Sequence, residues 1–165
     1  MLLSFTQWLQ GTGFFTYVRE SSYTYPVILA MHMVVILLFG GMILMTDMRL
    51  LGLAMQRYPV SSVIDRLRIP KRCGLIAMVA FGFILFGCKA EEYYYNAWFR
   101  VKIALLLLIG VHYLIFRSGV YNNTRAPDSS PSLPPRAKLA GALSLILWTA
   151  VVCAGRGIGY IQGPR

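Results

Sequence analysis

Four long apolar segments separated by polar ones dominate the pattern of the chain. The clearest, Pro26 to Thr46, carries no formal charge over about 21 residues, the length at which an apolar segment spans a bilayer. Three further runs, 73–88, 98–116 and 139–154, are shorter, and flanking aromatic and basic side chains can extend them by snorkelling. None of the four segments alternates between apolar and polar residues as the strands of a membrane β-barrel do. The pattern predicts an all-α, integral membrane four-helix bundle with spans at about 24–47, 72–89, 98–117 and 138–155.

The segment before the first span has a different pattern. Residues 1–20 lack the basic start of a signal peptide, and Gly11 and Gly13 divide them into two short apolar pieces. We therefore expect no cleavage here. The first piece, at about 2–10, is expected to form a short interfacial helix on the outer surface, with Phe5, Trp8 and Leu9 in lipid.

Composition agrees with a membrane protein. The chain has 165 residues, 57% hydrophobic and 13% charged, whereas soluble domains have roughly a quarter charged. A soluble or disordered protein is therefore excluded, and the length allows one domain, residues 1–165. The net charge of +10 comes from basic residues between apolar runs, with no basic face. Nucleic acid is not an expected partner, and the charge indicates orientation in a bilayer instead.

The basic residues are concentrated in two of the polar connections. These hold Arg49, Arg57, Arg66, Arg68, Lys71 and Arg72 after the first span, and Arg117, Arg125, Arg136 and Lys138 after the third. Positive loops are cytoplasmic, so both termini are predicted to be periplasmic, in the inner membrane of a bacterium. The second connection contains NNTRAPDSSPSLPPR, whose Pro and Ser content predicts a mobile linker.

Three cysteines without a CxxC pair indicate neither a zinc site nor a disulfide framework. Cys88 and Cys153 are both expected near the outer surface. The sequence leaves open whether they pair.

Both histidines of the chain, His32 and His112, fall inside predicted spans. A buried imidazole in hydrocarbon is costly unless it binds a metal or a polar partner, so each is a functional candidate. Two histidines on antiparallel helices would suit haem b, whose iron takes axial imidazoles from facing helices. The alternative is that each histidine bonds a neighbouring helix and serves packing alone.

The depths of the two histidines argue against one haem between them. His112 lies about 21 Å from the outer end of its span, and His32 about 9 Å, or about 16 Å if its helix begins near Ser21. One bridging haem then needs helix tilt or a long first helix. Lys102 lies about 6 Å in, and its long side chain can reach toward the level of His32 or snorkel to the headgroups. Lys102 and His112 are about 15 Å apart along their helix, so they cannot bind the same side of one iron.

Other residues near these candidates each have two interpretations. Arg49 inside and Arg100 outside could hold haem propionates or anchor the helices at the interface. Gly40 and Gly41 would admit either a flat macrocycle or another helix. The methionines at 42, 45 and 48 form a stripe of soft ligands that would suit Cu(I). Because the stripe lies about 80° to 160° around the helix from His32, we interpret it as lipid or core contact.

Three segments, AMHMVVILLFGG, TDMRLLG and AWFRVKIALLLLIGVHYLIFR, resemble small bacterial membrane proteins of the HemJ-type protoporphyrinogen oxidase and CopD-type copper-resistance group. The resemblance covers about residues 21–121. The histidine of the first span, the arginine at its exit and the Trp-x-x-Lys with a later histidine would be His32, Arg49, Trp98, Lys102 and His112 here. It implies b-type haem with His32 and Lys102 as axial pair and His112 as a second functional residue. The final helix lacks the Asn-Glu-x-Pro-like ending of HemJ.

The sequence thus favours a membrane protein that binds one or two haems b and transfers electrons. Besides the lipid bilayer, the expected partners are a quinone or a cytochrome, within a larger complex or a homo-oligomer. The candidate cofactor and metal residues are His32, Lys102 and His112, with Arg49 and Arg100 beside the cofactor. The alternatives are a tetrapyrrole oxidase like HemJ, a copper transporter like CopD, and a structural subunit without haem. No hydrolase triad, phosphate loop or nucleotide motif is present.

Overall fold

The computed structural model describes residues 2–116, 119 and 134–160. Its helices are α1 (Leu2–Gln10), α2 (Gly13–Glu20), α3 (Thr24–Leu51), α4 (Val60–Cys88), α5 (Ala90–Tyr95), α6 (Ala97–Phe116) and α8 (Pro135–Gly157). No strand occurs among these residues. Four of the helices, α3, α4, α6 and α8, are long and apolar enough to cross a membrane. The predicted all-α membrane bundle is therefore confirmed.

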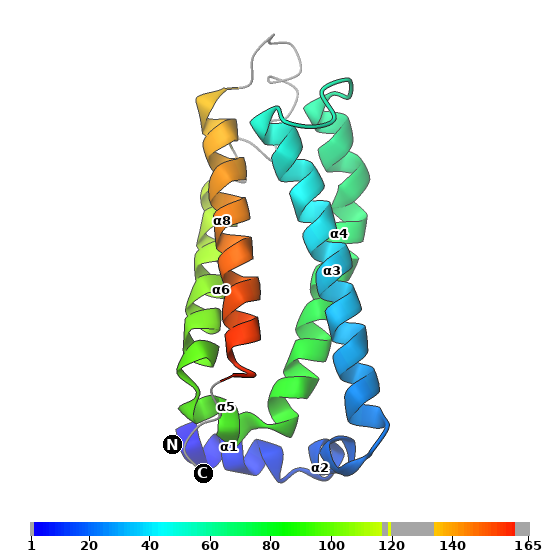
Figure 1. Cartoon of the computed structure of the whole chain (residues 1–165), viewed down its shortest axis with the longest axis vertical. Helices are drawn as coiled ribbons and strands as arrows, with labels where there is room; N and C mark the ends of the chain where they lie inside the picture. The colour runs from blue at the N-terminus through cyan, green and yellow to red at the C-terminus, as the bar shows by residue number, and fades with distance from the viewer. Residues whose placement is uncertain (1, 117–118, 120–133, 161–165) are drawn as a thin grey trace.

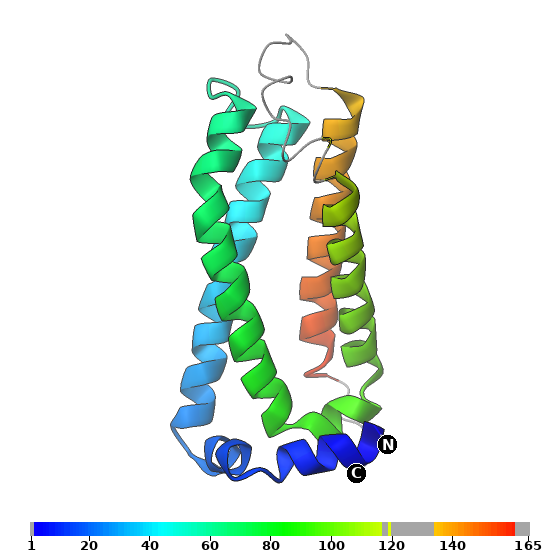
Figure 2. The same ribbon diagram turned by 180° about the vertical axis from the view of Figure 1, so that it is seen from behind.

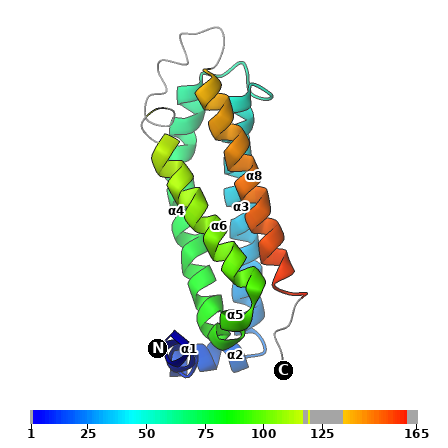
Figure 3. The same cartoon turned by 90° about the vertical axis from the view of Figure 1, so that its left-hand side faces the viewer.

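The four long helices stand side by side as two pairs (Figures 1 and 2). α3 packs along α4, α6 packs along α8, and α3 also packs along α8. Extended packing between α4 and α6 is absent from the described helices, so α8 and α3 join the two pairs. An even number of long helices returns the chain to its starting side, and α1 and the end of α8 lie at the same end of the bundle (Figure 3).

The helix that contains the second predicted span is longer than the sequence suggested. It was expected to start near residue 72, but α4 begins at Val60 and includes Pro70. Val60, Val63 and Ile64 are buried at helical spacing on its first turns. Val60 and Ile64 pack with Leu50 and the start of α8. The other three helices begin and end within four residues of the predicted spans. Most of the predicted linker, residues 122–133, lies outside the described residues.

Three short helices cover the end of the bundle where α1 lies (Figure 1). α1 has the predicted bounds, and Phe5 and Trp8 are exposed as expected. The placement of Leu9 in lipid was wrong, because Leu9 is buried against Phe15, Val18 and Cys88. α2 and α5 were not predicted. Together, α1, α2 and α5 form a layer across this end of the bundle, where the sequence predicted one interfacial helix.

The α6 and α8 helices are fixed to each other at this same end. Asn96, which is buried, accepts hydrogen bonds from the backbone N–H groups of Trp98 (2.9 Å) and Phe99 (3.2 Å) and so caps α6. Its side-chain amide donates to the Ile158 carbonyl (3.3 Å) beyond α8. Next to it, the Trp98 ring fills the space that a Cβ at Gly157 would need. This close contact fixes the register of α6 against α8.

The aromatic rings of Phe86, Tyr93 and Phe99 stack where α4, α5 and α6 meet, with centroids 5.0 to 6.3 Å apart. Burial is the main cause that raises the pKa of the Tyr93 phenol above its ordinary value. The phenol therefore stays neutral, and no charge is placed in the aromatic contact between α4, α5 and α6.

Candidate functional site

His32 lies on α3 with 8% of its surface exposed. The edge of its ring faces Gly82 of α4, where a Cβ would come within 3.3 Å of Cε1 and 3.8 Å of Nε2. Glycine at this position therefore makes room for the imidazole. The Nδ1 atom is buried and has no hydrogen-bond partner. Buried polar atoms are almost always paired in proteins, so an imidazole nitrogen left without a partner indicates that something outside the chain satisfies it.

Lys102 lies on α6 with its side chain against Gly155 of α8, where a Cβ would be 3.7 Å from Nζ. It is partly buried. The charge of Lys102 also acts on His32, so the two side chains lie within electrostatic range of each other although they belong to different helix pairs. Among the ion pairs in the described part of the chain, none involves Lys102.

The packing of α3 against α8 determines at which level of the bundle each of these two residues lies. Gly40 of α3 packs against Trp148 of α8 so closely that a Cβ would lie 2.6 Å from Nε1 of the indole. From this crossing, His32 is eight residues away along α3, about 12 Å. Gly155, beside Lys102, is seven residues away along α8 in the same direction, about 10.5 Å. His32 and Lys102 therefore lie at nearly one level of the bundle.

His112 lies elsewhere. It is also 8% exposed, its ring packs against Phe116 with centroids 4.9 Å apart, and its Nε2 has no hydrogen-bond partner. Ten residues of α6 separate it from Lys102, about 15 Å toward the opposite end. The structure thus places His32 and Lys102 at nearly one level of the bundle and His112 at another.

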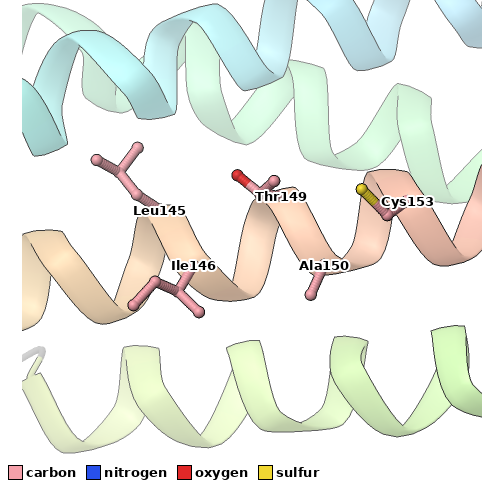
Figure 4. Close-up of a pocket in the computed structure, with 5 residues that line it drawn as sticks. All are labelled: Leu145, Ile146, Thr149, Ala150 and Cys153. Atoms are coloured by element: carbon pink, nitrogen blue, oxygen red, sulfur yellow. The ribbon is translucent and has the colours of Figure 1, made fainter.

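A pocket of about 420 Å³ runs along α8 between these levels (Figure 4). In Figure 4, Leu145, Thr149 and Cys153 point toward α3 and α4, while Ile146 and Ala150 lie on the side of α6. The lining is mostly apolar, and Leu145 and Cys153 are eight residues apart, about 12 Å. Its volume falls in the range of small-molecule and cofactor sites.

The two candidate arginines already bond the backbone. Arg49 donates from Nε to the Tyr58 carbonyl (2.8 Å), which ties α3 to the segment after it. Arg100 is exposed and donates to the Tyr94 carbonyl from Nε (3.3 Å) and a terminal nitrogen (3.0 Å). Both guanidinium groups therefore have a structural role at opposite ends of the bundle. Neither role excludes further contacts, since a guanidinium carries five donor hydrogens.

One polar cluster was missed by the sequence analysis. Asp47 on α3 is 2% exposed, with Ser144 of α8 as a hydrogen-bond partner and Lys71 of α4 within electrostatic range. Lys71 donates to the Thr46 hydroxyl (2.6 Å), which itself donates to the Met42 carbonyl (3.0 Å). In the sequence, Asp47 lies in the TDMRLLG segment at the exit of the first span. Its burial depends on how α4 and α8 close over α3, which no local pattern reveals.

The cysteines form no disulfide. Cys73 and Cys153 are exposed and Cys88 is buried, and all three are free. Within the described residues, no group of three or more His, Cys, Asp or Glu side chains is arranged to hold a metal ion.

Fold and site together define an integral membrane helical bundle with a buried histidine on α3 beside α4 and a partly buried lysine on α6 beside α8. The chain belongs to the DUF6644 family, a family of unknown function, whose model matches residues 5–161. No curated protein and no solved structure matches the chain.

Proposed function

We propose that this protein binds haem b between its helix pairs and transfers electrons in the membrane. The observation that carries the proposal is the common level of His32 and Lys102, with a buried imidazole nitrogen that lacks a partner. A histidine on α3 and a neutral lysine on α6 would be the two protein ligands of the iron. The orphaned imidazole nitrogen offers such a group one ligand, and the Lys102 amine at the same level offers a second.

Haem b would supply a one-electron ferric/ferrous couple. The chain's own residues would do the rest. His32 and Lys102 would hold the group, Gly82 leaves room for the imidazole, and Thr149 offers a hydroxyl in an otherwise apolar pocket along α8. The layer of α1, α2 and α5 closes this end of the bundle and limits access of water. A dry, apolar surrounding is one of the means by which proteins tune the potential of a haem.

The site near His32 would lie on the periplasmic side of a bacterial inner membrane. Arg49, Arg57, Arg66, Arg68, Lys71 and Arg72 are concentrated at the other end, which favours a cytoplasmic location for that end. Both termini would then be periplasmic. The redox partner would be a quinone or another cytochrome, reached as a subunit of a larger complex or as a homo-oligomer. His112, about 15 Å from Lys102 along α6, would be a second functional residue that does not hold this haem.

The experiment is a spectrum of the purified full-length protein and four variants. Reduced-minus-oxidised absorbance with pyridine-haemochrome quantification gives the haem type and amount for the wild type, His32→Ala, Lys102→Met, His112→Ala and Lys89→Met. Lys89→Met is the matched control, because Lys89 is a lysine at the same end that pairs with Glu92 (3.3 Å) instead. We expect a b-type spectrum that is lost with His32→Ala, changed or lost with Lys102→Met, and kept in the other two.

Other outcomes decide against the proposal. A wild type that stays colourless with added haem and retains copper supports the CopD-like reading. Oxidation of protoporphyrinogen by the protein alone supports the HemJ-like enzyme. A colourless protein that binds neither leaves His32 and His112 as packing residues.

A further inference from the structure

A second pocket, of about 300 Å³, lies at the opposite end of the bundle. The end of α3, the connecting segment 52–59 and the first turns of α4 enclose it. Its polar lining residues are Tyr58, Ser62 and Arg66, and its apolar ones include Met45, Met55 and Leu67. It is separate from the His32 site, because Met45 is thirteen residues from His32 on α3, about 20 Å.

The connecting segment is held in a fixed shape around this pocket. α3 ends in a left-handed Gly52 (φ 76°), and the Leu53 N–H bonds back to the Met48 carbonyl (2.9 Å). Met55 is also left-handed (φ 55°), which is uncommon for a residue with a side chain. The hydrogen bond from Arg49 to the Tyr58 carbonyl then returns the segment to α3. The pocket is thus formed by folded backbone.

Arg66 supplies the charge of this pocket. Its neighbour Arg68 pairs with Asp65 (2.8 Å), whereas none of the ion pairs in the described residues uses Arg66. A further cation, Arg57, lies in the connecting segment itself. Nearby carboxylates do not balance them, because Asp65 is already paired and Asp47 is buried inside the bundle. The pocket therefore offers an available guanidinium beside an apolar wall.

We infer that this pocket binds an anionic phospholipid, with the phosphate at Arg66 and the glycerol and first acyl carbons against Met45 and Leu67. A guanidinium binds a phosphate through paired, charge-assisted hydrogen bonds. Basic pockets between membrane helices are a recurrent site for anionic lipid headgroups. The apolar lining favours a lipid over a free anion, which would leave that wall unfilled. This inference does not depend on haem binding.

The test compares Arg66→Gln with Arg68→Gln in the full-length protein. Both changes remove one exposed cation from the same helix, but only Arg66 lines the pocket. The protein is incorporated into vesicles of phosphatidylglycerol or of phosphatidylcholine and then released from them. Native mass spectrometry counts the lipid molecules that stay bound to each protein. We expect the wild type to retain phosphatidylglycerol, Arg66→Gln to lower retention at least about tenfold, and Arg68→Gln to stay within about twofold. Arg66→Lys, which keeps the charge without the planar fork, should lie between them.

Three results would overturn the inference. Equal losses in Arg66→Gln and Arg68→Gln would indicate general surface attraction. Equal retention of phosphatidylcholine would remove the role of the negative headgroup. Displacement of the lipid by excess inorganic phosphate would identify a free-anion site. Circular dichroism of each variant verifies that the helices are intact.

Discussion

Replacing Lys71 by methionine should destabilise the bundle by leaving the Asp47 carboxylate without its cation. Asp47 is 2% exposed, and Lys71 is the cation that acts on it. The two form no direct ion pair in the described structure, so their charged atoms lie more than about 4 Å apart. At an effective dielectric constant of about 20, the attraction is about 3 kcal/mol. The substitution also removes the hydrogen bond from Lys71 to Thr46, and it relieves the cost of burying the ammonium.

Together these contributions predict a loss of about 2–3 kcal/mol for Lys71→Met. In Asp47→Asn/Lys71→Met no charge remains, so most of this loss should be recovered and the coupling energy should be about 2 kcal/mol. The assay is equilibrium unfolding in mixed detergent micelles, read as the free energy of unfolding. Lys138→Met is the control, since Lys138 is exposed at the same end and should change stability by less than about 0.5 kcal/mol. If Lys71→Met equals this control, or if the double variant is additive, the two charges are not coupled.

Three further predictions concern the other parts of the bundle. Gly82→Leu should displace the His32 ring and lower haem retention at least about tenfold. Gly110→Leu, where no atom lies within 4 Å of the Cβ position, should leave haem retention unchanged. Equal haem retention in the two variants would contradict the placement of His32. Gly87→Ala should push the Phe15 ring out of its cluster and speed thiol labelling of the buried Cys88 about tenfold, measured by mass spectrometry against Gly13→Ala. Reporters inserted after Gln56 and after Tyr160 should be cytoplasmic and periplasmic, respectively; the opposite pattern would reverse the orientation.

The spans could be predicted because an uncharged run of about 20 residues has few other uses. The start of α4 was missed because its residues do not form such an uncharged run. Its first turns bury Val60, Val63 and Ile64 at helical spacing, but the basic residues among them and Pro70 resemble a polar connection. Leu9 was misplaced because a short amphipathic helix shows which residues are apolar, while the side that faces protein depends on α2 and α4.

Only part of the candidate site could be predicted from the sequence. His32, Lys102 and His112 stand out as ionisable groups in apolar runs, and the distance between Lys102 and His112 follows from helix geometry alone. The common level of His32 and Lys102 does not, because it depends on the contact of Gly40 with Trp148 and of Gly155 with Lys102. The burial of Asp47 likewise depends on the packing of three helices.

The most direct test of the central proposal is the number of haems b per polypeptide in the full-length protein, purified from cells supplied with a haem precursor. With His32 and Lys102 as one axial pair, the count is one haem per chain, and Lys102→Met lowers it or changes the spectrum while Lys89→Met does neither. A wild-type protein without haem, even after addition of hemin, would contradict the proposal.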